Sequence, residues 1–314
     1  MHRLQNAGRD SGKTNGVDRV TTDKPIPIGR FAPSPTGSLH LGSLYTALAG
    51  FLHARSLRGK WLIRIDDLDT PRNIKGSADT ILATLDAFGL HWDDNVDYQS
   101  RHLDLYNDRL NDLAKNGLIY PCTCSRKTLS SIGSGIYPGI CRSKPYPPEA
   151  PHALRVKTDS RIIAFRDELQ GLISHNLAEQ DGDFILKRKD RIIAYQFAVV
   201  IDDDRQHINH IVRGCDLLDE TPKQIYLQQL LGLATPAYMH LPVIVDSQGY
   251  KLSKQTRATA VDSKAPEAVI FELLQLLKQN PPHELQHTPV NELLDWAVAH
   301  WNPVSLKNTR KLAI

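Results

Sequence analysis

The pattern of apolar positions between residues 28 and 65 predicts a strand, a helix and a second strand. Between residues 41 and 52 apolar side chains recur at steps of three and four, which predicts a helix that ends before Gly59. The short apolar runs 28–32 and 61–65 on either side predict strands. Two strands joined by one helix at this spacing form a right-handed βαβ unit with a parallel sheet. We therefore expect an α/β fold.

Further helices and strands are predicted along the rest of the chain. The helices are expected at 77–88, 101–116, 222–231, 266–278 and 290–301, and the strands at 153–157, 208–212 and 240–245, with short antiparallel strands between 161 and 186. The helix at 77–88 begins with a serine, a residue type favoured at the N-cap, and Gly89 follows its end. Because a second helix follows it directly, we expect an inserted subdomain there.

This pattern divides the chain into four parts. We expect a disordered extension over 1–24, a main α/β domain over 25–98 and 192–260, an insertion over 99–191, and a short helical part over 261–314. The extension is polar and has almost nothing to bury. No apolar run approaches the ~20 residues of a membrane span, and the polar start does not resemble a secretory signal. A cytoplasmic protein without a membrane anchor is expected.

Composition and charge add little to this picture. The 314 residues are 41% hydrophobic and 23% charged, which is typical of a soluble globular protein. The formal net charge is +3, and residues 1–24, with five basic and three acidic residues, supply +2 of it. An RNA-binding surface would therefore have to be local, and the basic runs 187–191 and 126–127 are the candidates. An ordinary solvated turn is the alternative for both runs.

The turn between the first strand and the first helix carries the first candidate chemistry. A strand, a turn with Gly37 and a helix start place backbone N–H groups and a positive helix end where a phosphate can bind. His40 can donate a hydrogen bond to a phosphate, and Gly42 lets a flat base approach the backbone. The alternative is an ordinary turn of an α/β protein in which His40 only caps the helix or packs against it.

A second motif, Lys251-Leu252-Ser253-Lys254, strengthens the first. Two lysines that flank a serine suit a polyphosphate whose charge rises during a reaction. Together with the turn, the motif resembles the nucleotide-binding motifs of class I aminoacyl-tRNA synthetases. The residues of both motifs are most similar to those of the glutamyl branch. The blocks that carry the resemblance are 29–43, 65–69, 195–203 with 212–214, and 251–254.

The resemblance extends over residues 28–260 and implies a Rossmann-like catalytic domain that binds ATP with Mg²⁺. By the same resemblance His40 and Lys254 are the catalytic residues. The residues it assigns to ATP binding are His40, Gly42, Lys251, Ser253 and Lys254.

Residues 66–69 lie just past the expected carboxyl end of the second strand, where parallel sheets bind ligands. A carboxylate there can accept hydrogen bonds from the ammonium group of an amino acid. In the glutamyl family the position of Asp66 is normally Glu, so this chain departs from the family pattern. The alternative is that one of the three aspartates in this run caps the next turn or pairs with Arg72.

Two arginines at expected strand ends, Arg30 and Arg213, suit the two carboxylates of glutamate because arginine binds a carboxylate bidentately. The alternative for Arg213 is an ion pair with Asp216 or Asp219. We also expect the Tyr195 hydroxyl and the pair at 202–203 to point into the site. The glutamate-binding residues that the resemblance implies are Arg30, Phe31, Ala32, Pro33, Ser34, Asp66, Tyr195 and Arg213.

The cysteines predict a metal site in the insertion. Of the four cysteines, three lie within 20 residues, and clustered cysteines in a cytosolic protein favour metal over disulfide. On residue type alone Tyr137 is a packing aromatic. The pattern Cys122, Cys124, Tyr137 and Cys141 resembles, however, the structural zinc site of the short paralogues of glutamyl-tRNA synthetase. Three reduced thiols are the alternative, and Cys215 is expected to be a small apolar filler.

After Lys254 only 60 residues remain, which leaves no room for the anticodon-reading domain of full glutamyl-tRNA synthetases. The resemblance to the short paralogues implies a monomer that activates L-glutamate with ATP to glutamyl-adenylate. It further implies transfer of the glutamate to queuosine in the anticodon of tRNA(Asp). Two alternatives remain: a truncated glutamyl-tRNA synthetase that charges a tRNA 3′ end, and a non-catalytic RNA-binding paralogue.

Overall fold

The computed structural model describes residues 26–131, 133, 136–145, 149–246, 248–249, 261 and 265–313. The strands are β1 (Ile28–Phe31), β2 (Lys60–Ile65), β3 (Asp97–Tyr98), β4 (Ile119–Cys122), β5 (Ala153–Val156), β6 (Ile162–Asp167), β7 (Gly171–Asn176), β8 (Ile185–Lys187), β9 (His210–Gly214), β10 (Ala237–Leu241), β11 (Val243–Val245) and β12 (Lys311–Ala313). The α-helices are α1 (Leu41–Ser56), α2 (Ser77–Ala87), α3 (Leu103–Lys115), α4 (Arg126–Ser130), α5 (Leu177–Gln180), α6 (Tyr195–Arg205), α7 (Thr221–Leu231), α8 (Pro266–Leu276) and α9 (Val290–Ala299). Single 3₁₀ turns lie at η1 (Thr70–Arg72), η2 (Gln99–His102), η3 (Cys215–Glu220), η5 (His283–His287) and η6 (Pro303–Leu306).

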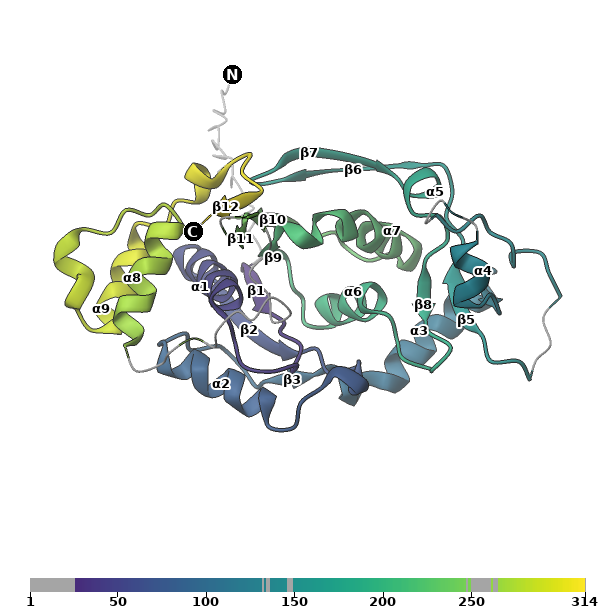
Figure 1. Ribbon diagram of the computed structural model, residues 1–314, viewed down its shortest axis with the longest axis horizontal. Helices are drawn as coiled ribbons and strands as arrows, with labels where there is room; N and C mark the ends of the chain where they lie inside the picture. Colours follow the sequence, from purple (N-terminus) through teal and green to yellow (C-terminus); the bar gives the residue numbers. More distant parts are fainter. Residues whose placement is uncertain are drawn as a thin grey trace, which may run out of the picture.

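Two sets of parallel strands lie side by side at the centre of the molecule. Strand β2 pairs with β1 and β3, and β10 pairs with β9 and β6, all in parallel. Strand β1 lies beside β9, where the Asn209 N–H donates to the Ile28 carbonyl at 3.0 Å. The helix α1 connects β1 to β2, so the expected βαβ unit is confirmed. Figure 1 shows α8 and α9 at one end of the molecule and the segment from β4 to β5 at the other.

The helix α1 is buried on almost all sides, as expected for a helix that is apolar around most of its circumference. It contacts β1 and β9 as well as α9. One hydrophobic cluster therefore includes Leu48 of α1, Leu274 of α8 and Leu293 of α9, each with 0% of its surface exposed. The C-terminal helices were expected at the right places, but they complete the main core and do not form a separate appendix.

The segment between α3 and α6 builds a second small sheet, β4–β5–β8, with antiparallel pairing. The antiparallel strands expected between 161 and 186 are confirmed as β6 and β7, and β6 also joins the central sheet through β10. Tyr137 bridges to Gly182, whose φ is +68°. A Cβ at Gly182 would lie 2.3 Å from the Tyr137 carbonyl oxygen, so only glycine permits this close approach.

Two local expectations need correction. The residue at the N-cap of α2 is Gly76, with φ of 80°, and not the serine. The Ser77 hydroxyl instead exchanges hydrogen bonds of 2.8 Å with the N–H and the carbonyl of Gly37, which ties α2 to the turn after β1. The strand expected at 240–245 is divided at Pro242 into β10 and β11, because proline cannot donate to a strand ladder.

Among the helices of the described residues, none has both the length and the apolar character needed to cross a membrane. The extension 1–24 lies outside the described residues.

Candidate active site

A cleft of about 690 Å³ opens at the carboxyl ends of β1, β2 and β9. Most of the residues predicted from sequence to bind glutamate or ATP line it. They are Arg30, Phe31, Ala32, Pro33, Ser34, His40, Gly42, Asp66, Tyr195 and Arg213. The predicted residues Lys251, Ser253 and Lys254 lie outside the described residues. Strand β11, the last described strand before them, lines the cleft with Val243 and Ile244.

His40 is the N-cap of α1. Its Nδ1 accepts from the Ser43 N–H at 3.2 Å, and its Nε2 lies 3.0 Å from the Ser43 hydroxyl. Because Nδ1 accepts, the ring proton of the neutral imidazole belongs on Nε2. The capping role left open by the sequence is therefore present. A phosphate could replace the Ser43 hydroxyl as the acceptor for Nε2 without disturbing the cap, and the first turn of α1 contains no acidic residue that would repel it.

Asp66 follows β2 and is 6% exposed. Its Oδ1 accepts from Arg64 Nε at 2.9 Å, whereas its Oδ2 is buried and has no hydrogen-bond partner among the described residues. Burial raises the pKa of Asp66 to about 6, against the opposing effect of Arg64. A buried acceptor without a partner is costly, so this oxygen is suited to a donor supplied by a ligand.

The other two aspartates of the run have structural partners. Asp67 accepts from the N–H of Ser100 at 2.8 Å and from its hydroxyl at 2.6 Å. Asp69 pairs with Arg72 at 2.7 Å. The alternative of a pair with Arg72 is thus correct for Asp69.

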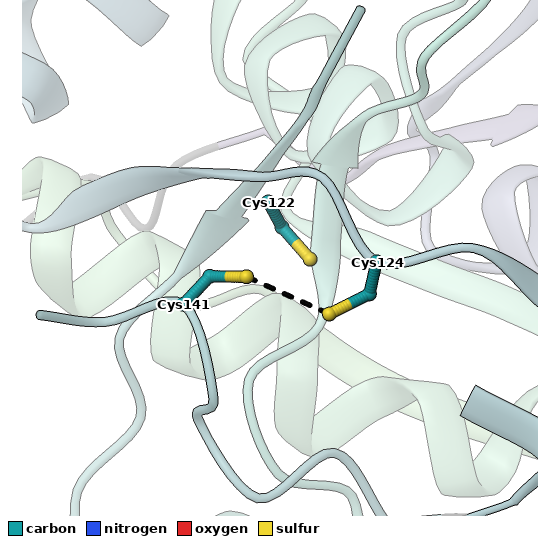
Figure 2. Close-up of side chains that lie close together, drawn as sticks. All are labelled: Cys122, Cys124 and Cys141. Carbon is teal, nitrogen blue, oxygen red and sulfur yellow. Dashed lines mark hydrogen bonds between the residues drawn. The ribbon is translucent and has the colours of Figure 1, made fainter. Parts of the chain in front are cut away.

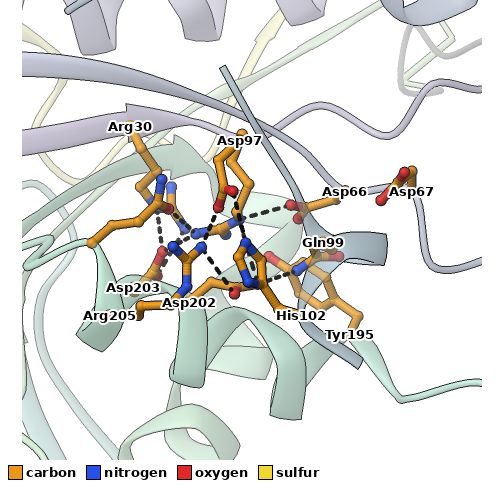
Figure 3. A network of polar contacts seen from close by, with 12 residues as sticks. Arg30, Asp66, Asp67, Asp97, Gln99, His102, Tyr195, Asp202, Asp203 and Arg205 are labelled. Atoms are coloured by element: carbon orange, nitrogen blue, oxygen red, sulfur yellow. Dashed lines mark hydrogen bonds and ion pairs between the residues drawn. The ribbon is translucent and has the colours of Figure 1, made fainter. Parts of the chain in front are cut away.

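A buried ionic network, shown in Figure 3, lies beneath the cleft. Arg64, whose side chain is 0% exposed, donates to Asp203 at 2.7 Å. Arg30 donates to the same carboxylate with Nε at 3.1 Å and Nη2 at 3.3 Å. Burial alone would raise the pKa of Asp203, but Arg30 and Arg64 outweigh it and hold the pKa below its usual value.

The pair at 202–203 was expected to point into the site, and this is wrong. Neither aspartate lines the cleft. Asp203 accepts hydrogen bonds from Arg30 and Arg64. Asp202 accepts from Tyr106 at 2.7 Å and from Gln99 at 2.8 Å. Helix α6 is buried along this face, so both carboxylates neutralise buried donors. Sequence reasoning missed Arg64, although a lone arginine within the apolar strand β2 is a signal for a buried partner.

Arg213, near the carboxyl end of β9, also lines the cleft but binds different partners. Its Nη2 donates to Thr221 Oγ1 at 2.7 Å, its Nε donates to His240 Nε2 at 3.0 Å, and its Nη1 lies 3.5 Å from the Tyr195 hydroxyl. Because His240 accepts through Nε2, its proton is on Nδ1, which donates to Asp167 at 2.6 Å. The side chains of both His240 and Asp167 are fully buried.

The series of hydrogen bonds from Asp167 through His240 orients the Arg213 side chain, since each of these side chains can make its hydrogen bonds in only one orientation. Sequence analysis identified Arg213 but not the residues behind it. His240 begins the apolar run at 240–245. A histidine in a strand that is expected to be buried is a weak signal of a buried hydrogen-bond partner.

The predicted metal residues also lie together, as Figure 2 shows for the cysteines. Cys124 Sγ is 3.5 Å from Cys141 Sγ, and the Tyr137 hydroxyl is 3.4 Å from Cys122 Sγ and 3.6 Å from Cys124 Sγ. Zn–S bonds of about 2.3 Å and Zn–O bonds of about 2.0 Å would set tetrahedral ligand atoms about 3.5–3.8 Å apart. The three thiols can hold a metal ion, and the donor set fits zinc.

The parallel strands, with a cleft at their carboxyl ends next to the N-terminus of α1, have the arrangement of a nucleotide-binding α/β domain. The profile of the family "tRNA synthetases class I (E and Q), catalytic domain" matches residues 28–134 and 142–277, and the chain belongs to this family.

Within this class the chain is similar to proteins named glutamyl-Q tRNA(Asp) synthetase. It is 47% identical over 287 residues to the one from Methylococcus capsulatus, which covers 91% of this chain and 95% of that protein. The one from Neisseria meningitidis serogroup C is 49% identical over 282 residues, with 87% and 95% covered.

Two solved structures have the same fold. They are a glutamate tRNA ligase from Elizabethkingia meningosepticum, in complex with its amino acid, and the glutamate-tRNA synthetase from Elizabethkingia anophelis. Each superposes with a TM-score of 0.76 and 25% identity over 91% of this chain. The chain spans only 66% and 68% of their lengths.

Proposed function

We propose that this protein activates L-glutamate with ATP and transfers the glutamyl group to queuosine in the anticodon of tRNA(Asp). The names of relatives at 47–49% identity support the reaction and the RNA. Within the structure, one observation carries the amino-acid part of the proposal. A buried carboxylate oxygen that has no partner among the described residues lines the same cleft as an arginine held by neutral groups. These two groups are complementary to the ammonium and a carboxylate of an amino acid.

We assign the ammonium of glutamate to Asp66 and a carboxylate to Arg213. The ammonium would donate to the buried Oδ2 of Asp66, whose ionised form it stabilises. Arg213 and the adjacent Tyr195 hydroxyl would donate to the carboxylate. Arg30 and the residues 31–34 form the rest of the proposed glutamate site along the floor and the turn.

The triphosphate of ATP is assigned to the N-terminus of α1. Backbone N–H groups, His40 and the space above Gly42 are available there, and Lys251, Ser253 and Lys254 would complete the site. A carboxylate oxygen of glutamate attacks the α-phosphorus, and the bond to the bridging oxygen of pyrophosphate breaks. No nucleophilic side chain is required, because the carboxylate of glutamate is itself the nucleophile. Cationic groups would stabilise the charge that builds on the phosphates. Mg²⁺ would bind with the ATP.

The insertion is proposed to hold one structural zinc ion through Cys122, Cys124, Tyr137 and Cys141. The ion would fix the loop after β4 and take no part in the chemistry, because the four residues are absent from the lining of the cleft. We further propose that the protein acts as a monomer in the cytoplasm.

Two assays test the function. Glutamate-dependent exchange of pyrophosphate into ATP, measured without RNA, tests activation. Transfer of labelled glutamate to tRNA(Asp) with and without queuosine tests the acceptor. We expect exchange without RNA and transfer only to the modified tRNA. Transfer to unmodified tRNA at its 3′ end would instead identify a truncated glutamyl-tRNA synthetase, and absence of exchange would favour a non-catalytic RNA-binding protein.

A further inference from the structure

Three hollows lie in a row on the molecule and share their walls. The catalytic cleft shares Ser34, Asp66, Arg72 and Tyr195 with a second hollow of about 370 Å³. The second hollow shares Arg188 with a third of about 540 Å³. A path of concave surface therefore runs from the catalytic cleft, past Arg188, to the hairpin turn after β8.

The third hollow, which we call the basic groove, is lined by Lys187, Arg188, Lys189 and Arg191 on one side and by residues 149–152 and Leu154 on the other. The cations belong to one tight turn, in which the Arg188 N–H donates to the Ile192 carbonyl at 2.8 Å. The pKa of Lys187 is lowered by burial and by the neighbouring charge of Arg191. Glu149 is the acidic residue of the lining, so the groove has an excess of positive charge.

The four cations differ in how they are engaged. Lys187 donates to Asn107 at 2.8 Å, and Lys189 donates to the Thr123 carbonyl at 2.7 Å, so both keep their charge next to a neutral partner. Arg188 is paired with Asp190 at 2.6 Å and lies 3.5 Å from Asp69. Arg191 is exposed, and its side chain has no hydrogen bond or ion pair within the described part of the chain.

The second hollow has a different character. Leu68, Ile185 and Ile192 give it apolar walls, and Gln99 and Gln196 add amide groups. Its lining also includes the charged residues Asp66, Asp69, Arg72 and Arg188. Apolar faces together with hydrogen-bonding groups at an edge are what a nucleobase requires, since its faces stack and its edge is polar.

We propose that the basic groove binds backbone phosphates of the RNA substrate, and that the second hollow receives the base which is carried to the catalytic cleft. This inference rests on the proposed function and specifies where the RNA lies. A row of cations on an open groove suits a polyanionic strand, because each lysine or arginine can neutralise one phosphate. Because Arg188 lines both, the basic groove and the second hollow are neighbours, and the second hollow in turn borders the catalytic cleft. A strand whose backbone lies in the basic groove could therefore place an unstacked base in the second hollow.

Arg191→Glu is the most direct test, with Arg58→Glu as the matched control. Both arginines are exposed and both have a left-handed backbone, with φ of 69° and 56°. Arg58 follows the C-terminal end of α1, whereas the N-terminal end of that helix lines the cleft. The wild type and both variants are compared for pyrophosphate exchange without RNA, and for transfer of glutamate to queuosine-containing tRNA(Asp) over a range of salt concentrations.

For Arg191→Glu we expect unchanged exchange, a rise in the KM for tRNA of roughly tenfold, and a salt slope of log KM that is smaller by about one. Arg191→Gln should change both in the same direction by less, and Arg58→Glu should match the wild type. An unchanged KM and salt slope in Arg191→Glu, an equal effect of Arg58→Glu, or a loss of exchange in Arg191→Glu would each overturn the proposal. If the wild type itself transfers no glutamate to tRNA, the proposed function fails first, which separates the two failures.

Discussion

Two arginines line the cleft, Arg30 of β1 and Arg213 of β9, but the structure gives them different partners. Arg30 uses two nitrogens on Asp203, a buried carboxylate that Arg64 shares. Arg213 is held by Thr221 and His240, which are neutral, and its charge is not cancelled by them. A carboxylate that pairs with a buried arginine cancels the charge of that arginine, whereas an arginine held by neutral groups keeps its charge available to a ligand. We infer that Arg30 mainly supports the floor of the cleft and that Arg213 is the principal anchor for a carboxylate.

The largest effect on stability is expected for Asp203→Asn. The substitution keeps the shape of the side chain but leaves Arg30 and Arg64 buried without their shared anion. We expect the free energy of unfolding to fall by about 3–5 kcal/mol, measured by urea denaturation. Asp204→Asn is the matched control, because Asp204 is exposed on the same helix and should change stability by less than about 0.5 kcal/mol. Equal stability of the two variants would show that the floor is not an ionic support.

Arg213→Gln should affect catalysis more than stability. It would remove the proposed charge-assisted hydrogen bonds to the glutamate carboxylate, so kcat/KM for glutamate in pyrophosphate exchange should fall roughly 100- to 1,000-fold. Arg213→Lys keeps the charge without the bidentate geometry and should lie between the wild type and Arg213→Gln. If Arg213→Gln instead unfolds the protein while its exchange rate per folded molecule is normal, the two arginines do not differ in the way inferred here.

Asp66→Asn should raise the KM for glutamate roughly 10- to 100-fold, because it would weaken the proposed charge-assisted hydrogen bond to the ammonium. Since burial raises the pKa of Asp66 to about 6, the carboxylate is ionised above that pH and neutral below it. In the wild type, the KM for glutamate should therefore rise about tenfold per pH unit below pH 6. Asp66→Glu should retain this pH dependence and Asp66→Asn should lose it. A pH-independent KM in the wild type would contradict the assignment.

The smallest effect on activation is expected for Cys124→Ser, because Cys124 does not line the cleft. Metal analysis should find about one zinc per wild-type chain and little in the variant, because Zn²⁺ requires its thiolate ligands. Pyrophosphate exchange should change by less than about twofold. Cys215→Ser, at the cysteine outside the cluster, should keep its zinc. Wild-type protein without zinc would remove the metal from the proposal.

Much of the cleft could be predicted from local patterns. The periodicity of α1 and the apolar run of β2 predict these elements. They put the turn before α1, Asp66 and Arg30 at one edge of the sheet, because strand ends meet there in a parallel sheet. The spacing of the cysteines likewise predicted a cluster that the structure brings together. Where prediction failed, as for the carboxylates of α6, the cause was the direction of a buried helix face, which apolar content does not reveal.

Local patterns along the chain are sufficient to predict the α/β order of the elements, the helix start that can receive a phosphate, and the residue types at the two strand ends. Which arginine is neutralised and which keeps its charge follows only from the folded protein. Asp203 reaches Arg30 across 173 positions and His240 reaches Arg213 across 27. Local periodicity contains no information about such distant partners. The electrostatic task of each side chain is set by its burial and its neighbours, and these exist only after the chain has folded.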